Sequence, residues 1–175
     1  MAETMVIATD GSKQATGAVR AGAQLAEKLG AAVVLVHVLP DHLTAGAARN
    51  LVAFDRLPAG AREEITQLED VERKANAFVE SAVSAVRLSP ATAEAIGNLV
   101  LDDAEALVRN HIAGKIRRAT MSGDPAGCIL EMARSSRAGF IVMGKRGLGR
   151  LTGLLVGSVS QKVSALADCT CIIVP

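Results

Sequence analysis

The chain has 175 residues, of which 50% are hydrophobic, and its formal net charge at pH 7 is +1. This length fits one domain with an insertion, and the near-neutral charge argues against a protein defined by a basic surface. There is no Trp, no Tyr and only three Phe. The chain therefore offers few aromatic platforms for stacking single-stranded nucleic acid, and we expect no nucleic acid among its partners.

The cysteines and the N-terminal segment favour a cytoplasmic protein. Three cysteines are an odd number, and no charged or apolar leader precedes the first strand pattern, which together favour reduced thiols. We interpret Cys169 and Cys171 as small residues of a strand rather than a metal pair, because no His or further Cys stands at zinc-ligand spacing. No apolar run approaches the roughly 20 residues that cross a bilayer. We expect a soluble cytoplasmic protein without a metal site or membrane insertion.

The first half of the chain begins with a strand, a helix and a second strand. The first strand is expected at Thr4–Thr9, and Asp10-Gly11-Ser12 then supplies a turn and a helix cap. Gly30 is the expected C-cap of the helix, and the second strand follows at Ala32–Val38. Apolar and small residues at helical spacing mark the buried face of the helix: Ala15, Val19, Gly22, Ala26 and Leu29.

The middle of the chain, about residues 41–114, is about 30 residues longer than one helical crossover requires. Residues 45–60 are interpreted as a loop with one short helical turn. Two helical patterns follow, and Ser89-Pro90 is expected to cap the second. The first pattern comprises Ile65, Leu68, Val71, Ala75, Phe78, Ala82 and Val86, and the second comprises Ile96, Val100, Ala104, Leu107 and His111.

The C-terminal part returns to strands alternating with helices. Asp124 is expected to cap one helix, and Ser158 to open the last one in a capping box with Gln161. The remaining strands are expected at Lys115–Met121, Gly139–Gly144 and Cys169–Val174, and the buried side of the last helix at Val159, Val163 and Leu166. Because helices separate the strands, the pattern predicts an α/β fold with a doubly wound, five-stranded parallel sheet.

The most informative segment is the glycine-rich loop Gly144–Ser158. It leads from the fourth strand into the N-terminus of a helix, where unpaired N–H groups and the helix dipole favour an anion. Lys145, Arg146 and Arg150 add positive charge. A glycine loop alone is a weak signal, because a surface turn with a capped helix gives the same pattern.

The position of Asp10 directly after the first strand makes it a candidate ligand-binding residue. In open α/β sheets the ligand crevice lies at the carboxyl ends of the strands, where the strand order reverses. If the order is 3-2-1-4-5, Asp10 and Gly144 face the same cleft, and Asp10 can accept hydrogen bonds from ribose hydroxyls while the loop holds phosphates. A turn or helix cap is an equally good interpretation of Asp10 from sequence alone.

These motifs together resemble the ATP-binding universal stress proteins. The spacing Gly144-x2-Gly147-x9-Gly157-Ser158 is similar to the G-2x-G-9x-G-(S/T) signature of that family. Three further segments resemble the family in the same order along the chain: Ile7-Ala8-Thr9-Asp10-Gly11-Ser12, Val36-His37-Val38 and Gly123-Asp124-Pro125-Ala126. The resemblance covers about residues 3–40 and 115–175.

The resemblance implies one universal stress protein domain over residues 1–175, with a helical insertion at about 41–114 and the strand order 3-2-1-4-5. It implies an adenine nucleotide as the bound partner: ATP, or ADP or AMP in its place, with or without Mg²⁺. It also implies a homodimer formed through the last strand, although Thr170 stands where family members often have proline. The residues implied to surround the nucleotide are Thr9, Asp10, Val38, Met143, Gly144, Arg146, Gly147, Gly157, Ser158, Val159 and Ser160.

Three functions stay open at this stage. The first is a regulatory, stress-response protein that binds ATP without rapid catalysis, because no general base or carboxylate cluster is evident beside the loop. The second is a slow ATPase, or an enzyme that phosphorylates itself on Ser158 or Ser160. The third is a nucleotide-independent protein that uses the helices of residues 61–112 to bind an unknown partner. Those helices either cover the sheet or project as an interaction surface, and they can also shield the adenine end of the cleft.

Overall fold

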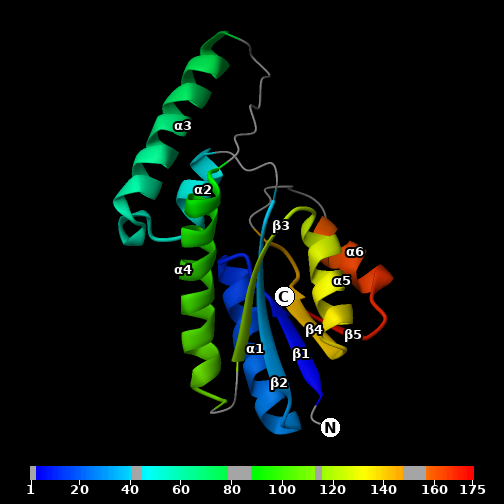
Figure 1. Ribbon diagram of the computed structural model, residues 1–175. Coiled ribbons are helices and arrows are strands. Elements are labelled where there is room, and N and C mark those ends of the chain that lie inside the picture. Colours follow the sequence, from blue (N-terminus) through cyan, green and yellow to red (C-terminus); the bar gives the residue numbers. More distant parts are fainter. Residues whose placement is uncertain (1–2, 41–44, 79–87, 113–115, 148–156) are drawn as a thin grey trace.

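The computed structural model describes residues 3–40, 45–78, 88–112, 116–147 and 157–175. Within these ranges five strands form one parallel sheet in the order β3-β2-β1-β4-β5 (Figure 1). The strands are β1 (Thr4–Ala8), β2 (Ala32–Leu39), β3 (Ile116–Ser122), β4 (Ala138–Gly144) and β5 (Thr170–Val174). The expected doubly wound α/β fold and its strand order are confirmed.

Helices cover both faces of the sheet, because alternate strand residues enter two separate cores (Figure 1). Val33 and Leu35 of β2 point to the face covered by α1 (Lys13–Leu29) and α4 (Pro90–Arg109). Val34 and Val36 point to the opposite face, covered by α5 (Pro125–Ser135) and α6 (Ser158–Leu166). The near-continuous apolar strands are therefore explained by burial on both sides.

Helix α1 begins and ends where the sequence indicates. The Ser12 side chain accepts a hydrogen bond from the Ala15 N–H at 3.2 Å, and Gly30 takes the left-handed conformation at φ 61°. A side chain at Gly22 would lie 2.7 Å from Ile7 of β1, so this glycine lets the helix pack closely on the sheet. The apolar face ends earlier than predicted, because Leu29, the last residue of α1, is 52% exposed.

The insertion between β2 and β3 has a small core of its own. It contains α2 (Ala45–Leu51), a short 3-10 turn at Phe54–Arg56 and α3 (Ala59–Phe78), where the sequence predicted a loop with one turn before a helix. Helix α4 packs on β2 and β3, whereas α3 packs on α2 and α4, so α3 forms a further layer outside the sheet cover (Figure 1). The buried residues of this third core are Leu39, Ala48, Leu57, Ala61, Ile65, Ile96 and Val100.

The apolar positions predicted for α3 are buried only in the first half of the helix. Ile65 is fully buried, whereas Val71 is 58% exposed. The predicted helical positions Ala82 and Val86 lie outside the described residues. None of the helices in the described parts of the chain is both long and apolar enough to cross a membrane.

Helices α5 and α6 differ in how they begin. Asp124 caps α5 as predicted and accepts a hydrogen bond from the Gly127 N–H at 3.0 Å. The predicted capping box at Ser158 is wrong, because Gly157 is the N-cap and Ser158 is the first helical residue, with no side-chain cap. Val163 is buried as predicted, but Leu166 is 52% exposed at the end of α6.

Candidate functional site

The strand order puts the ends of β1 and β4 side by side. β1 leads into α1 on one face of the sheet, whereas β4 is followed by α6 on the opposite face. The two chain segments therefore diverge at the carboxyl edge between these neighbouring strands. This divergence is the point at which open α/β sheets form their ligand crevice.

The turn after β1 is fixed by local hydrogen bonds. The Thr9 N–H donates to the Val36 carbonyl at 2.9 Å, and the Ser12 N–H donates to Asp10 Oδ1 at 3.0 Å. Gly11 between them has φ 79°, a conformation that favours glycine. The second carboxylate oxygen of Asp10 is thereby directed away from its own turn.

That oxygen lies against Gly147. A Cβ atom at position 147 would collide with Asp10 Oδ2 and lie 3.2 Å from Asp10 Cγ. A side chain at 147 would therefore displace the Asp10 carboxylate from its place against the loop backbone. The expected strand order thus brings the aspartate after the first strand against the glycine-rich loop at Gly147, and the binding role of these residues stays a prediction.

The ends of the glycine-rich loop are tied together at the carbonyl group of Lys145. This carbonyl accepts hydrogen bonds from the Gly157 N–H at 2.9 Å and from the Ser160 hydroxyl at 2.8 Å. A Cβ atom at Gly157 would lie 3.1 Å from the same carbonyl oxygen, and one at Gly144 would lie 3.0 Å from the Arg146 carbonyl oxygen. Both glycines therefore permit close backbone contacts at the root of the loop.

The N-terminus of α6 faces this root without a side-chain cap. Its first N–H groups and the helix dipole make it suitable for an anion. Ser158 is exposed there, and Arg146 is exposed on the loop. Ser160, by contrast, is buried and its hydroxyl donates to the carbonyl groups of Lys145 and Gly157, so it links Lys145 to the start of α6. Arg150 lies outside the described residues.

The remaining predicted site residues lie on both faces of the sheet. Val38 and Met143 are buried in the core under α5 and α6, with Val159 packed against that core. Thr9 instead borders a cavity of ≈ 80 Å³ between α1 and α4. The other residues that line this cavity are Gly11, Thr16, Val19, Val100, Asp103, Ala104 and Leu107. Thr9 and Val38, both predicted to border adenine, are therefore separated by the sheet.

The sequence did not indicate one part of this arrangement, because the Lys145 carbonyl is a backbone group and leaves no signature in the sequence. The cavity wall contributed by α4 comes from the insertion region. Its helices were expected to cover the sheet or to project as an interaction surface, and also to be able to shield the adenine end of the cleft. His37, from the Val36-His37-Val38 segment, is 1% exposed and its ring Nδ1 lies 2.9 Å from the Thr9 carbonyl oxygen.

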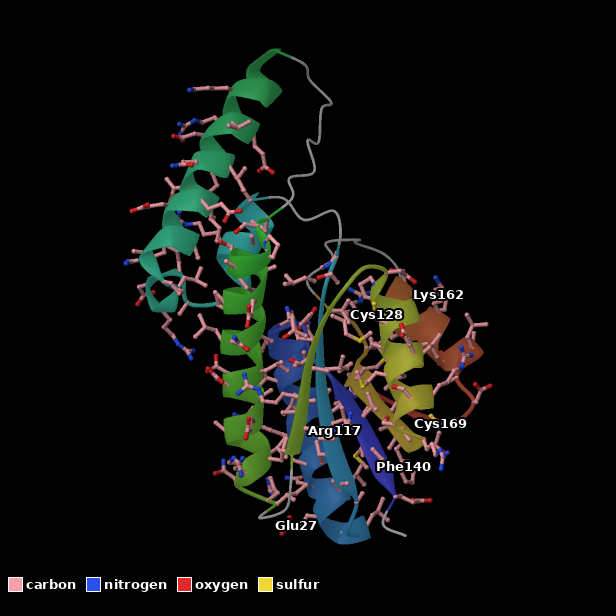
Figure 2. The ribbon with its side chains drawn as sticks, in the orientation of Figure 1. Glu27, Arg117, Cys128, Phe140, Lys162 and Cys169 are labelled. Atoms are coloured by element: carbon pink, nitrogen blue, oxygen red, sulfur yellow. The ribbon has the colours of Figure 1, made fainter. Side chains whose placement is uncertain are left out.

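Metal ligands do not gather at this site. Across the described ranges, no group of three or more His, Cys, Asp or Glu side chains is arranged to hold a metal ion. Cys169 (Figure 2) and Cys171 are both half-buried, and burial raises the pKa of each thiol. Both thiols therefore stay protonated at neutral pH.

A doubly wound parallel sheet with a glycine loop and an aspartate at its switch point defines a class of open α/β proteins with a ligand crevice at the carboxyl edge. Within that class, the model described as "Universal stress protein family" matches residues 1–175, and the chain belongs to this family.

Curated relatives agree with this assignment. The chain is 26% identical over 174 residues to the universal stress protein YxiE of Bacillus subtilis (strain 168), a match that covers 99% of each chain. It is 48% identical over 54 residues to a Thermus aquaticus protein described as a universal stress protein in the QAH/OAS sulfhydrylase 3′ region. That match spans 31% of this chain and 39% of the Thermus aquaticus protein.

Solved structures share the fold at low sequence identity. A universal stress protein in complex with cAMP is 20% identical, with a TM-score of 0.60 over 99% of this chain and 96% of that chain. The universal stress protein from Archaeoglobus fulgidus in complex with dAMP is 18% identical, with a TM-score of 0.59 over 100% of this chain and 98% of that chain.

Proposed function

We propose that this chain is a stress-response protein that binds an adenine nucleotide, ATP above all, at the carboxyl edge between β1 and β4. The observation that carries the proposal is the contact of the Asp10 carboxylate with Gly147, which brings a ribose acceptor and a phosphate loop together. The two similar structures in complex with cAMP and dAMP support the adenine nucleotide as the ligand class.

The residues at the edge suit the two ends of such a ligand. Asp10 accepts hydrogen bonds from the ribose hydroxyls, because a carboxylate is an acceptor only. The N–H groups at the start of α6 and the Ser158 hydroxyl donate to phosphate oxygens, and Arg146 adds positive charge. Gly147 and Gly157 keep the backbone close to the phosphates because neither has a side chain. Mg²⁺ would arrive with the nucleotide, since ATP supplies its own oxygen ligands.

We propose binding, rather than rapid turnover, as the role of the site. Ser160 is poorly placed to receive a phosphate, because its hydroxyl is 2% exposed and bonded to the Lys145 carbonyl. Ser158 is the exposed hydroxyl of the pair. Binding would act by favouring one conformation or one oligomeric state of the protein in the cytoplasm.

The proposal is tested by calorimetric titration of the purified, nucleotide-free protein with MgATP. Asp10→Ala should weaken binding about 10- to 100-fold, which corresponds to a lost hydrogen bond to a charged group. Gly147→Ala should weaken binding to a similar extent, because the added methyl group displaces the Asp10 carboxylate. Gly157→Val should abolish measurable binding, because its side chain meets the backbone at the loop root.

Gly17→Ala is the matched control, because a Cβ atom at this position in α1 meets no atom within 4 Å. Its affinity should equal that of the wild type. Unchanged affinity in Asp10→Ala and Gly147→Ala would remove the crevice from consideration as the nucleotide site. Absence of binding to the wild type at millimolar ATP would contradict the proposed function itself.

The proposed homodimer rests on the position of β5. This strand lies at one edge of the sheet, next to β4 (Figure 1). The outer side of an edge strand carries N–H and C=O groups that another chain can pair with. We therefore propose pairing of two copies through Thr170–Val174.

A further inference from the structure

His37 connects the buried sheet to the turn that carries Asp10. It lies in β2, the strand next to β1 (Figure 1). Its ring is 1% exposed, and Nδ1 lies 2.9 Å from the Thr9 carbonyl oxygen. A carbonyl oxygen only accepts hydrogen bonds, so Nδ1 carries the proton and donates it.

The other ring nitrogen of His37 makes no comparable hydrogen bond. Nε2 is buried and has no hydrogen-bond partner among the described residues. Burial lowers the pKa of His37, against the opposing effects of the Thr9 hydrogen bond and the Asp10 charge, so the ring stays neutral at pH 7. A neutral ring that donates from Nδ1 leaves a buried lone pair on Nε2, which is unfavourable. An apolar side chain would fill this place without that penalty, so the value of histidine here lies in its Nδ1–H group.

The Nδ1–H group holds the peptide that joins Thr9 to Asp10. The parallel pairing of β1 with β2 continues as far as the Thr9 N–H, which donates to the Val36 carbonyl. Within the described part of the chain, no backbone N–H pairs with the carbonyl of Thr9, and the His37 ring takes that role. Because the Thr9 carbonyl and the Asp10 nitrogen belong to one planar peptide unit, a bond to this oxygen fixes the direction in which the chain enters Asp10.

Two further hydrogen bonds then complete the turn. The Gly11 N–H donates to Thr9 Oγ1 at 3.2 Å, and the Ser12 N–H donates to Asp10 Oδ1 at 3.0 Å. Both bonds depend on the orientation of the Thr9–Asp10 peptide. The Asp10 carboxylate consequently reaches Gly147 from a turn whose entry is set by His37.

We propose that His37 is a positioning residue of the nucleotide site, whose Nδ1–H group orients the Thr9–Asp10 peptide so that the Asp10 carboxylate meets the ribose hydroxyls beside Gly147. The inference rests on the proposed function for its ligand. It assigns the ribose specificity of the site to a buried histidine that does not touch the nucleotide.

The test compares ATP with 2′,3′-dideoxy-ATP, which lacks both ribose hydroxyls. The wild type should bind ATP about tenfold more tightly, since Asp10 pairs with those hydroxyls. In His37→Phe the preference for ATP should fall to less than about threefold, with little change in affinity for the dideoxy nucleotide. His37→Asn should restore the preference, because the Asn amide nitrogen occupies nearly the position of Nδ1. His37→Gln should not, because its amide reaches further along the chain.

Leu35→Val is the matched control for core damage. Leu35 lies on the same strand and the same face as His37 and is fully buried. It should lower the melting temperature without changing the ATP preference. An equal loss of affinity for both nucleotides in His37→Phe, or a preference that stays at the wild-type value, would overturn the positioning role. Failure of the wild type to bind either nucleotide would instead contradict the proposed function.

A ligand-free measurement keeps the inference testable in that case. The amides of Gly11 and Ser12 should exchange with solvent at least about tenfold faster in His37→Phe than in Leu35→Val, because local opening of the turn becomes easier. The ¹⁵N signals of the His37 ring in the wild type should show Nδ1 protonated and Nε2 unprotonated. Unchanged amide exchange, or protonation on Nε2 instead, would overturn the inference without any nucleotide.

Discussion

The side chain of Glu64 joins helix α3 to the N-terminus of helix α4. Its carboxylate accepts three hydrogen bonds at 2.5 Å, from the Ser89 N–H, the Ser89 hydroxyl and the Thr92 hydroxyl. Ser89 is also the N-cap of α4 and accepts from the Thr92 N–H. We predict that Glu64→Gln destabilises the protein and changes how its stability depends on pH.

The magnitude follows from these three bonds. A hydrogen bond to a charged group contributes about 1.5–3 kcal/mol when buried, and the half-exposed carboxylate of Glu64 reduces this to about 0.5–1 kcal/mol each. Glu64→Ala should then cost about 2 kcal/mol in the free energy of unfolding. Glu64→Gln keeps an acceptor for the Ser89 N–H but loses the charge, so it should cost about 1 kcal/mol.

The pH dependence has a definite sign. Burial raises the pKa of the Glu64 carboxyl group, but the hydrogen bonds from Ser89 and Thr92 together outweigh burial, so the pKa lies below its usual value. A depressed carboxyl pKa contributes stability that is fully present above the unfolded-state pKa and is lost as the pH falls through the folded-state value. The stability difference between wild type and Glu64→Gln should therefore be largest at pH 7 and shrink below about pH 4.3.

Urea unfolding followed by far-UV circular dichroism measures this difference, because the chain has no Trp or Tyr for fluorescence. Glu63→Gln is the control, since Glu63 is an exposed neighbour on α3 and should change stability by less than about 0.5 kcal/mol. Equal stability of Glu64→Gln and the wild type at pH 7, or a difference that grows as the pH falls, would refute this reasoning.

Two further predictions concern the backbone and the sheet edge. Gly17→Ala should stabilise the protein by about 1 kcal/mol, because Gly17 lies inside α1 with open space at its Cβ position. Gly30→Ala should destabilise the protein by about 1 kcal/mol, because Gly30 has φ 61°, a conformation that disfavours alanine. Thermal unfolding of both variants checks the pair, and a change of the same sign in both would contradict it. Light scattering should give a mass of twice 18.0 kDa if two chains pair through β5, and a monomer at all accessible concentrations would exclude that pairing.

The strands could be predicted from sequence because parallel strands are apolar on both faces and stand out between polar turns. Each predicted strand lies within a residue or two of the observed one, as for Thr4–Ala8 and Ala138–Gly144. The ends of helices were predicted less well. Leu29 and Leu166 continue the apolar spacing to the last residue of their helices, where both are exposed, and periodicity does not reveal where burial ends.

The contact at the candidate site was predictable for a different reason. Strand order and the known place of the crevice bring Asp10 and Gly147 together without any knowledge of side-chain packing. The start of α6 at Ser158 was predicted correctly, but its cap was not, because the N-cap Gly157 is held by a bond to the distant Lys145 carbonyl. The short helix α2 was missed because seven residues carry too little periodic signal.

Helix α4 belongs to two cores at once. Leu101 enters the core shared with α1 and the sheet, whereas Val100 enters the core of the insertion and also lines the cavity beside Thr9. Packed interiors transmit displacement rather than absorb it. Val100 therefore links the insertion to the cavity wall, so a substitution that repacks the core of the insertion should also change the shape of the cavity beside Thr9.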